Sequence, residues 1–238
     1  GGQAPAEAGD FEMWGLMFFP GLLWAFSRLY EKTNIANALF CAIFTAGLLT
    51  SHNLSAMLFI PIVVVWVIFL FFQKKVIKFL WFSLAGTVLG VCLASFYLFP
   101  MLFEKNLVHV ETTTYGYFGF TEHFKGFKKL LDRSWGYGTS IREVPGGGKD
   151  GLSYQIGWIH LLGWVLALYS SYKLWRKNRY LSLSIIFSTA ILLFSIFMIN
   201  PRSQFIWDGA PPLKYLQFPW RFLLVVIFFI SFVSGSVF

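Results

Sequence analysis

The chain has 238 residues, of which 57% are apolar and only 13% are charged. A mean hydropathy of +0.64 excludes an ordinary soluble domain, whose composition is much more polar. The 19 basic residues outnumber the 11 acidic ones, but no basic run lies in a nucleic-acid-binding motif. Membrane loops explain the excess, and we expect no nucleic-acid partner.

Seven stretches of roughly 15 to 25 residues contain no Asp, Glu, Lys or Arg. At about 1.5 Å per residue, each is long enough to cross a hydrocarbon core of about 30 Å. The predicted helices cover residues 13–30, 35–50, 54–72, 79–103, 155–172, 180–199 and 222–238. We therefore expect an all-α, polytopic transmembrane bundle that forms a single domain over residues 1–238.

The ends of the chain and its two cysteines add two expectations. There is no initiator Met and no signal-peptide n-region, and the last apolar segment ends at Phe238 without a flanking charge. We expect a fragment of a longer protein. Cys41 and Cys92 lie within apolar segments, where a thiol usually acts as a small buried hydrophobic group.

The charges of the loops predict how the chain crosses the membrane. Alternation of the helices collects nine basic residues and one acid, Glu31, in short loops on one side, which the positive-inside rule assigns to the cytoplasm. These basic residues are Arg28, Lys32, Lys74, Lys75, Lys78, Lys173, Arg176, Lys177 and Arg179. The other ten acids fall on the external side, together with ten basic residues, seven of them in the loop 104–154.

Two local patterns refine this prediction. In the loop, apolar residues recur at helical spacing from Phe120 to Leu131 with basic residues between them, and Thr121 is placed as a cap. This predicts an amphipathic helix in the membrane interface. In the fourth predicted helix, Gly86, Gly90 and Ala94 form a small-residue stripe that favours close helix packing.

Candidate site residues lie at the predicted outer face. Glu12, with Asp10 before it, opens the first helix, where a carboxylate suits a general base for a sugar hydroxyl but is also favoured by the helix dipole. His52 and Asn53 lie in a polar corner between two helices, either as functional groups or as residues of a simple turn. Arg221 precedes the last helix, either as a bidentate phosphate ligand or as an interfacial anchor.

Other polar residues give weaker signals. His109 and His123 have Glu111 and Glu122 beside them, but the spacing matches no metal-ligand motif, so we expect no metal and no other cofactor. The glycine run that ends at Asp150 lacks the Ser or Thr of a phosphate-binding loop.

Four short motifs carry a family resemblance: residues 50–53, 100–105, 150–157 and 217–221. Together they resemble bacterial membrane proteins of the 6-pyruvoyl-tetrahydropterin synthase-related family, which is similar to YfhO-type proteins and GT-C glycosyltransferases. A further family pattern starts with Arg before Gly9, where this chain has Ala8.

The resemblance implies a cell-membrane enzyme that transfers sugar from a polyprenyl-phosphate donor at the outer face. It implies that His52, Asn53, Glu104, Asp150 and Arg221 bind this lipid-linked sugar, that Glu12 and Asp10 are catalytic, and that the main acid lies upstream of residue 1. Two other functions stay open. The chain is either a transporter or lipid flippase, although no paired halves are visible, or a non-catalytic envelope assembly protein, whose protein partners the sequence does not indicate.

Overall fold

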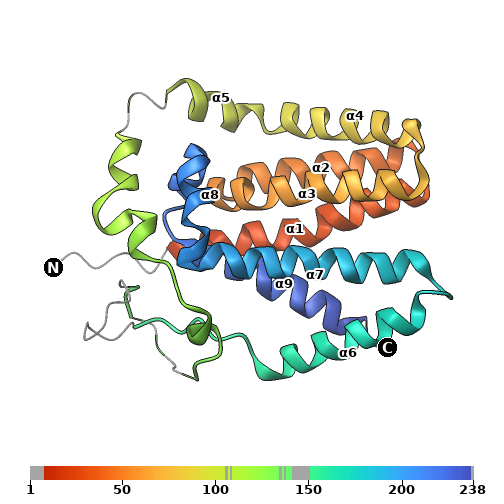
Figure 1. The fold of residues 1–238 in the computed structure, drawn as a ribbon. Coiled ribbons are helices and arrows are strands. Elements are labelled where there is room, and N and C mark those ends of the chain that lie inside the picture. Colours follow the sequence, from red (N-terminus) through yellow and green to blue (C-terminus); the bar gives the residue numbers. More distant parts are fainter. Residues whose placement is uncertain are drawn as a thin grey trace. The chain divides into compact units, whose positions relative to one another are not determined.

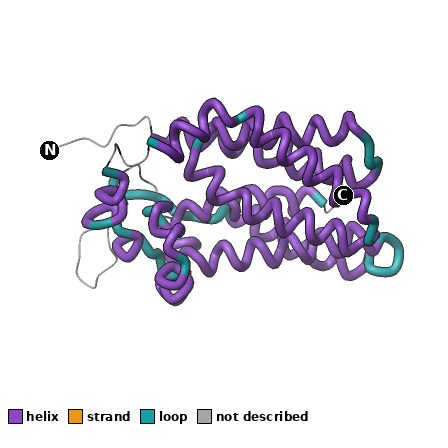
Figure 2. Tube along the Cα trace, turned by 90° about the horizontal axis from the view of Figure 1, so that it is seen from above, coloured by secondary structure: helices purple, strands orange, loops and turns teal. Residues whose placement is uncertain are grey.

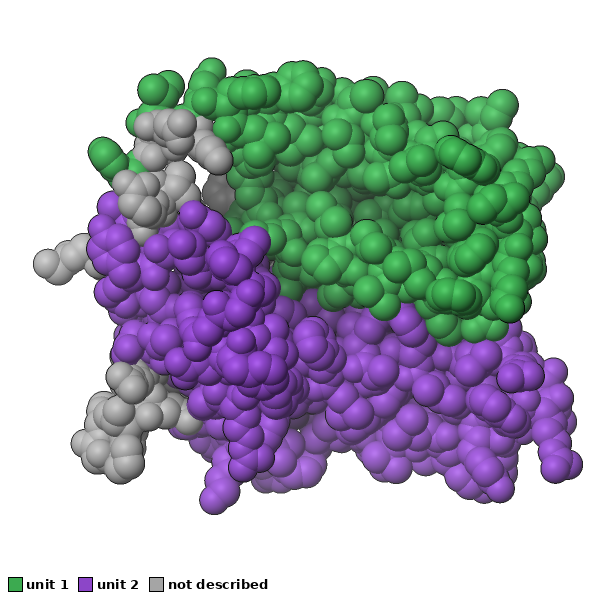
Figure 3. All heavy atoms as spheres, turned by 45° about the horizontal axis from the view of Figure 1, so that its top comes forward, with its two compact units in different colours: residues 1–109 green, residues 110–238 purple. Residues whose placement is uncertain are grey.

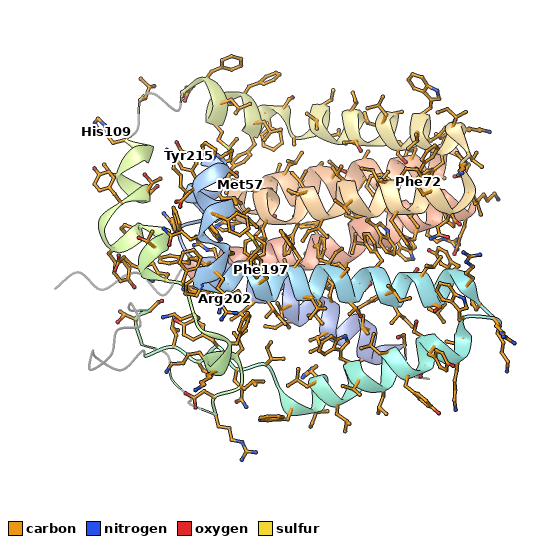
Figure 4. The ribbon with its side chains drawn as sticks, in the orientation of Figure 1. Met57, Phe72, His109, Phe197, Arg202 and Tyr215 are labelled. Atoms are coloured by element: carbon orange, nitrogen blue, oxygen red, sulfur yellow. The ribbon has the colours of Figure 1, made fainter. Side chains whose placement is uncertain are left out.

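The computed structural model describes residues 8–104, 107, 109–133, 136, 138–140 and 151–236, with no side chains described at residues 8–13, 110 and 111. The described residues form helices, turns and loops (Figure 2), with one isolated bridge residue at Leu152. This confirms the all-α prediction. The chain divides into two compact units, residues 1–109 and 110–238, coloured separately in Figure 3.

The first unit is a bundle of helices (Figure 1): α1 (Ala8–Glu31), α2 (Ile35–Ser51), α3 (Asn53–Lys74), α4 (Ile77–Leu93) and α5 (Ser95–Phe103). α2 packs against both α1 and α4, and α1 also packs against α3. Buried aromatic rings join these helices, since Phe19 of α1 stacks on Phe59 of α3 with centroids 4.2 Å apart. The predicted helices 13–30, 35–50 and 54–72 are therefore confirmed, with α1 beginning earlier than expected.

The small residues of α4 let it approach α2 closely, as the sequence predicted. A Cβ added at Gly86 would lie 2.7 Å from the carbonyl oxygen of Ala38, and one at Gly90 would lie 2.6 Å from the Cβ of Thr45. Such distances leave no room for a methyl group. Glycine at these two positions is thus a requirement of the helix contact.

The predicted helix 79–103 is wrong as a single element. α4 ends at Leu93, Ala94 makes a turn, and α5 continues at an angle of 70°. Pro100, inside α5, cannot donate a backbone hydrogen bond, which weakens the helix just beyond the break. The tyrosine hydroxyl of Tyr97 in α5 donates to Asn53 Oδ1 at 2.9 Å, so α5 turns toward the start of α3.

The turns that carry basic residues, α1–α2 and α3–α4, lie at one end of the first unit. Lys74 Nζ donates to the carbonyl oxygen of Tyr30 at 3.4 Å and lies 4.2 Å above that tyrosine ring. The C-terminal ends of α1 and α3 therefore meet. Asn37 fixes the intervening α1–α2 turn by donating to the carbonyl oxygen of Lys32 at 2.6 Å.

The second unit is built on three apolar helices, α6 (Trp158–Leu174), α7 (Arg179–Ile199) and α9 (Phe222–Gly235). α9 packs against both α6 and α7, and Ala167, Ile185 and Val233 form a buried cluster where the three meet. Paired hydroxyls add polar contacts, since Ser171 and Ser182 lie 2.8 Å apart. The predicted helices 155–172, 180–199 and 222–238 are confirmed with small changes in their ends.

Among the described residues, α3 and α7 are long and apolar enough to cross a membrane, and the bent pair α4–α5 makes three if it is counted as one span. α2 and residues 219–235 are shorter apolar helices. The chain therefore has the character of a membrane protein.

Candidate functional site

The segment that follows residue 109 forms short 3-10 turns: η2 (Val110–Thr114), η3 (Gly116–Phe118), η4 (Phe120–Glu122) and η5 (Phe127–Leu130). The prediction of an amphipathic α-helix here, with Thr121 as its cap, is wrong, because Thr121 lies inside η4 and the cap position is Gly119. Glycines explain the difference. Gly116 has a φ of +64°, and Gly119 and Gly126 take extended backbone angles that interrupt a helix.

This segment packs onto the connection between α7 and α9. That connection contains η6 (Pro201–Ser203), α8 (Gln204–Gly209), η7 (Pro211–Leu216) and η8 (Pro219–Arg221). Trp207 of α8 is buried and donates its indole N–H to the carbonyl oxygen of Met198 at 3.2 Å. Phe120 stacks on Trp207 with centroids 5.3 Å apart, so the turns pack against a buried aromatic side chain.

His123 is the most constrained polar residue of the segment, with no exposed surface. Its Nε2 contacts the carbonyl oxygen of Tyr117, and its Nδ1 lies 2.9 Å from Ser140 Oγ. A carbonyl oxygen only accepts hydrogen bonds, so Nε2 must carry the proton. In the neutral imidazole, Nδ1 then accepts from the Ser140 hydroxyl. The ring of Phe218 packs edge-on, 4.6 Å away.

Ser140 lies beside His123 because the backbone at Gly138 packs closely against the backbone at Gly151. The N–H of Gly138 donates to the carbonyl oxygen of Gly151 at 2.7 Å. A Cβ added at Gly138 would be 2.7 Å from the Gly151 Cα, so only glycine permits this approach. This backbone contact holds Ser140 beside the imidazole of His123.

Lys125 is fully buried, although its charge led us to place it on the polar side of the predicted helix. Its backbone N–H donates to the carbonyl oxygen of Ile199 at 2.9 Å, and its ammonium group lies 5.0 Å from the ring centre of Tyr154. A cation above an aromatic face is stabilised by the ring quadrupole. Lys125 thus ties the turns to the end of α7.

Arg221, whose guanidinium we predicted at the headgroup level, is also buried. Its Nη1 donates to the carbonyl oxygen of Leu216 and to Gln217 Oε1, and its guanidinium lies 4.8 Å from the ring centre of Phe218. These contacts hold the turn before α9. Gln217 needs that support, because it has a φ of +62°, and its Nε2 also donates to Thr113 O.

An aromatic series connects the two buried cations. Tyr154 contacts Trp220, and Trp220 stacks on Phe218 with centroids 5.2 Å apart. The indole N–H of Trp220 is buried and has no hydrogen-bond partner among the described residues. This region therefore combines two positive charges with an unused donor.

The turns enclose a pocket of about 580 Å³. Its lining is mixed, with aromatic rings, hydroxyls and one carboxylate. The pocket is lined, among others, by Tyr115, Tyr117, Phe120, Glu122, His123 and Ser140. Among the residues predicted for the site, none lines this pocket. From the sequence, His123 and Glu122 were weighed only as metal ligands and were not placed in the site.

The structure gives His52 and Asn53 local roles. His52 is the N-cap of α3, where its Nδ1 accepts from the N–H of Ser55 at 3.3 Å and lies 3.0 Å from the Ser55 hydroxyl. Asn53 is exposed and accepts from Tyr97. These contacts match the alternative of a turn that satisfies its own backbone. A substrate role for the two residues stays a prediction.

The remaining predicted residues are Glu104, Asp10, Glu12 and Asp150. Glu104 is exposed at the end of α5. Asp10 and Glu12 belong to the first turns of α1, but their side chains are outside the described residues, as is all of Asp150. No three His, Cys, Asp or Glu side chains in the described part of the chain gather closely enough to hold a metal ion.

Comparisons with known proteins found no match of the chain to a protein-family model, to a curated protein or to a solved structure.

Proposed function

We propose that the chain is a multi-pass protein of the cell membrane that resembles the GT-C glycosyltransferases and transfers sugar from a polyprenyl-phosphate donor at the outer face. All seven apolar segments cross the membrane in this proposal, and the loop 104–154 is external. The single observation that carries it is the mixed pocket beside the two buried cations, in a chain whose helices are otherwise apolar.

The pocket suits one sugar ring. Its volume of about 580 Å³ falls in the range of small-ligand sites, which combine apolar walls with a few placed polar groups. Tyr117 and Phe120 offer ring faces to the C–H groups of a sugar, and the hydroxyls of Thr114 and Thr121 offer hydrogen bonds. His123 is buried in the pocket wall, where Tyr117 and Ser140 hold its ring in one orientation and so fix the shape of that wall.

The donor phosphate would be held by the neighbouring cationic region. Lys125 and Arg221 bring two positive charges into a largely dehydrated environment, where their attraction for an anion is stronger than in water. The Trp220 indole N–H has no partner among the described residues and would donate to a phosphate oxygen. Phe218 joins this region to the pocket through His123.

Glu122 is the carboxylate in the wall of this pocket. A carboxylate within reach of an acceptor hydroxyl can take its proton as the hydroxyl oxygen attacks the anomeric carbon, while the bond from that carbon to the phosphate oxygen breaks and polyprenyl phosphate leaves. We therefore assign to Glu122 the general-base role first predicted for Glu12 and Asp10, which stay alternatives.

The test is reconstitution of the protein with polyprenyl-phosphate-linked sugars and cell-envelope acceptors. We expect Glu122→Gln to slow transfer about 100-fold or more, while donor affinity changes little. Asp208→Asn, at an exposed carboxylate of α8 that does not line the pocket, is the control and should transfer normally. Absence of both transfer and donor binding in the unaltered protein would refute the proposal.

Arg221→Lys tests the phosphate contact. It keeps the charge and loses the planar fork, so donor binding should weaken by about 1 to 3 kcal/mol. Because Arg221 also holds the turn before α9, thermal unfolding must be measured beside the donor titration. Unchanged affinity in a folded Lys variant removes Arg221 from the site.

Orientation is tested by cysteine labelling in intact cells, in a Cys41→Ala/Cys92→Ala background. Cysteines replace the exposed residues Thr139 and Lys177 in turn. We expect a membrane-impermeant thiol reagent to label position 139 in intact cells and position 177 only after the membrane is opened. The reverse pattern contradicts an external pocket.

A further inference from the structure

A second pocket, of about 550 Å³, lies within the first unit and is walled by α1, α2, α3 and α4. Its lining is almost entirely apolar. Several lining side chains on α3 and α4 are exposed: Ile60, Val64, Ile68, Ile77, Trp81, Leu84 and Val91. A groove that opens between exposed aliphatic side chains suits a hydrocarbon chain. We call it the α3–α4 groove.

The groove is long in the direction of the helices. Its lining on α4 runs from Ile77 to Val91, which at about 1.5 Å per residue is about 21 Å. This length is about two-thirds of a hydrocarbon core of about 30 Å. A single acyl chain lying along the helices would be accommodated over most of its length.

Basic residues surround one end of the groove. Ile77 belongs to the lining, and Lys75 and Lys78 lie on either side of it in the sequence. Lys74 reaches across to the end of α1, where it contacts Tyr30. The nearby acid, Glu31, is in an ion pair with Arg28 at 3.2 Å. The α3–α4 turn therefore carries three lysines, Lys74, Lys75 and Lys78, next to the end of the groove that Ile77 lines.

Ser83 supplies a second, independent indication of a ligand. It lines the groove, it is only 5% exposed, and its hydroxyl has no hydrogen-bond partner among the described residues. A buried hydroxyl without a partner costs free energy. Ser83 is five residues beyond Lys78, about 7.5 Å along the helix, which is near where the ester carbonyls of a phospholipid lie when its phosphate is at the lysines.

We propose that the α3–α4 groove binds one anionic glycerophospholipid. Its phosphate lies at Lys74, Lys75 and Lys78, an ester carbonyl accepts from the Ser83 hydroxyl, and one acyl chain fills the groove. Charge selects an anionic lipid over a zwitterionic one, because the three ammonium groups interact with the net charge of the headgroup. The site needs membrane residence, but it is independent of sugar transfer.

The experiment is native mass spectrometry of the full chain in a neutral detergent, titrated with phosphatidylglycerol or with phosphatidylcholine of the same acyl chains. We expect phosphatidylglycerol to bind about tenfold more tightly. The variant K74Q/K75Q/K78Q should lose this preference. The variant K173Q/R176Q/K177Q, in the exposed α6–α7 turn, is the matched control and should bind within about twofold of the unaltered protein.

The proposed hydrogen bond of Ser83 is tested from both partners, by removing the hydroxyl from the protein and the ester carbonyl from the lipid. Ser83→Ala should weaken phosphatidylglycerol about threefold, the effect of one neutral hydrogen bond. A dialkyl ether phosphatidylglycerol lacks the carbonyl and should bind both proteins equally. Thr87→Trp, at a half-buried lining residue, should displace the acyl chain, with thermal unfolding as the check on folding.

Three results would overturn the proposal: equal affinity for the two lipids, equal losses in the two triple variants, or equal competition by glycerol 3-phosphate, which has no acyl chain. If Thr87→Trp does not fold, the comparison of ester and ether lipids with Ser83→Ala still decides. None of these titrations contains a sugar donor, so a protein without transferase activity can still confirm the lipid site.

Discussion

The two pockets of this protein have nearly the same volume, about 580 and 550 Å³, and are built in opposite ways. The α3–α4 groove is walled by regular helices whose shape follows from side-chain packing. The pocket of the second unit is walled by 3-10 turns that depend on buried polar and charged groups such as His123 and Lys125. Substitutions should therefore act on the first through steric fit and on the second through charge and hydrogen bonding.

The largest effect is expected at the buried lysine of the second unit. Lys125→Glu places a carboxylate against the negative face of the Tyr154 ring, and the free energy of unfolding should fall by about 3 kcal/mol. Lys128→Glu, at an exposed position in η5, should change it by less than about 0.5 kcal/mol. Denaturant titration in micelles measures both. Equal losses of unfolding free energy in the two variants would show that the buried position of Lys125 does not contribute to stability.

A purely steric change comes next, in the first unit. Gly90→Ala adds a methyl group 2.7 Å from the carbonyl oxygen of Ala42, so α2 and α4 must separate, at a cost of about 2 kcal/mol. Gly235→Ala in α9 meets nothing within 4 Å and should be neutral or slightly stabilising. Thermal unfolding compares the two. A neutral Gly90→Ala would show that the α2–α4 contact is not tight.

Ser140→Ala tests the polar construction of the second pocket. Its loss leaves the buried Nδ1 of His123 without the Ser140 hydroxyl, so the protein should lose about 1.5 kcal/mol. Thr139→Ala, one residue earlier and exposed, is the control and should be nearly neutral. The same two variants should differ in donor affinity if the orientation of His123 matters for the proposed sugar. Equal stability of the two variants would show that the hydrogen bond between Ser140 and His123 does not stabilise the protein.

The smallest effect is expected at the cap of α3. His52→Ala removes the acceptor for the Ser55 N–H and should cost about 1 kcal/mol, whereas His52→Asn keeps a capping side chain and should cost much less. Donor binding separates the two roles. If both variants bind the donor normally, His52 is only a cap, and if both lose it equally, the predicted substrate role is supported.

Most of the helices could be predicted from sequence because each is a long apolar stretch bounded by polar turns. The exception is the 79–103 segment, where uniform apolarity concealed a break at Ala94. Apolar composition reports burial in lipid or protein but says nothing of the direction in which a helix continues. Pro100 was a visible signal that the segment is not one regular helix.

The candidate site was harder to predict because it depends on glycines and buried polar groups rather than on periodicity. The spacing of Phe120, Phe124 and Phe127 fits a helix, yet Gly119 and Gly126 interrupt it. These two glycines were visible in the sequence, but the prediction gave more weight to the apolar periodicity. Nothing in the sequence pairs His123 with Ser140, since close approach of Gly138 and Gly151 brings them together.

The bend at Ala94 also sets the hydrophobic length of the helix pair α2 and α4. A straight helix from Ile77 to Phe103 would be about 40 Å long, about 10 Å more than the hydrocarbon core, and would have to tilt steeply or thicken the bilayer around it. Ending at Leu93, α4 is about 25 Å long, which matches its packing partner α2, also 17 residues. If this helix pair crosses the bilayer as proposed, the lipid beside it meets a short hydrophobic length, and we expect the protein to be most stable in thin membranes.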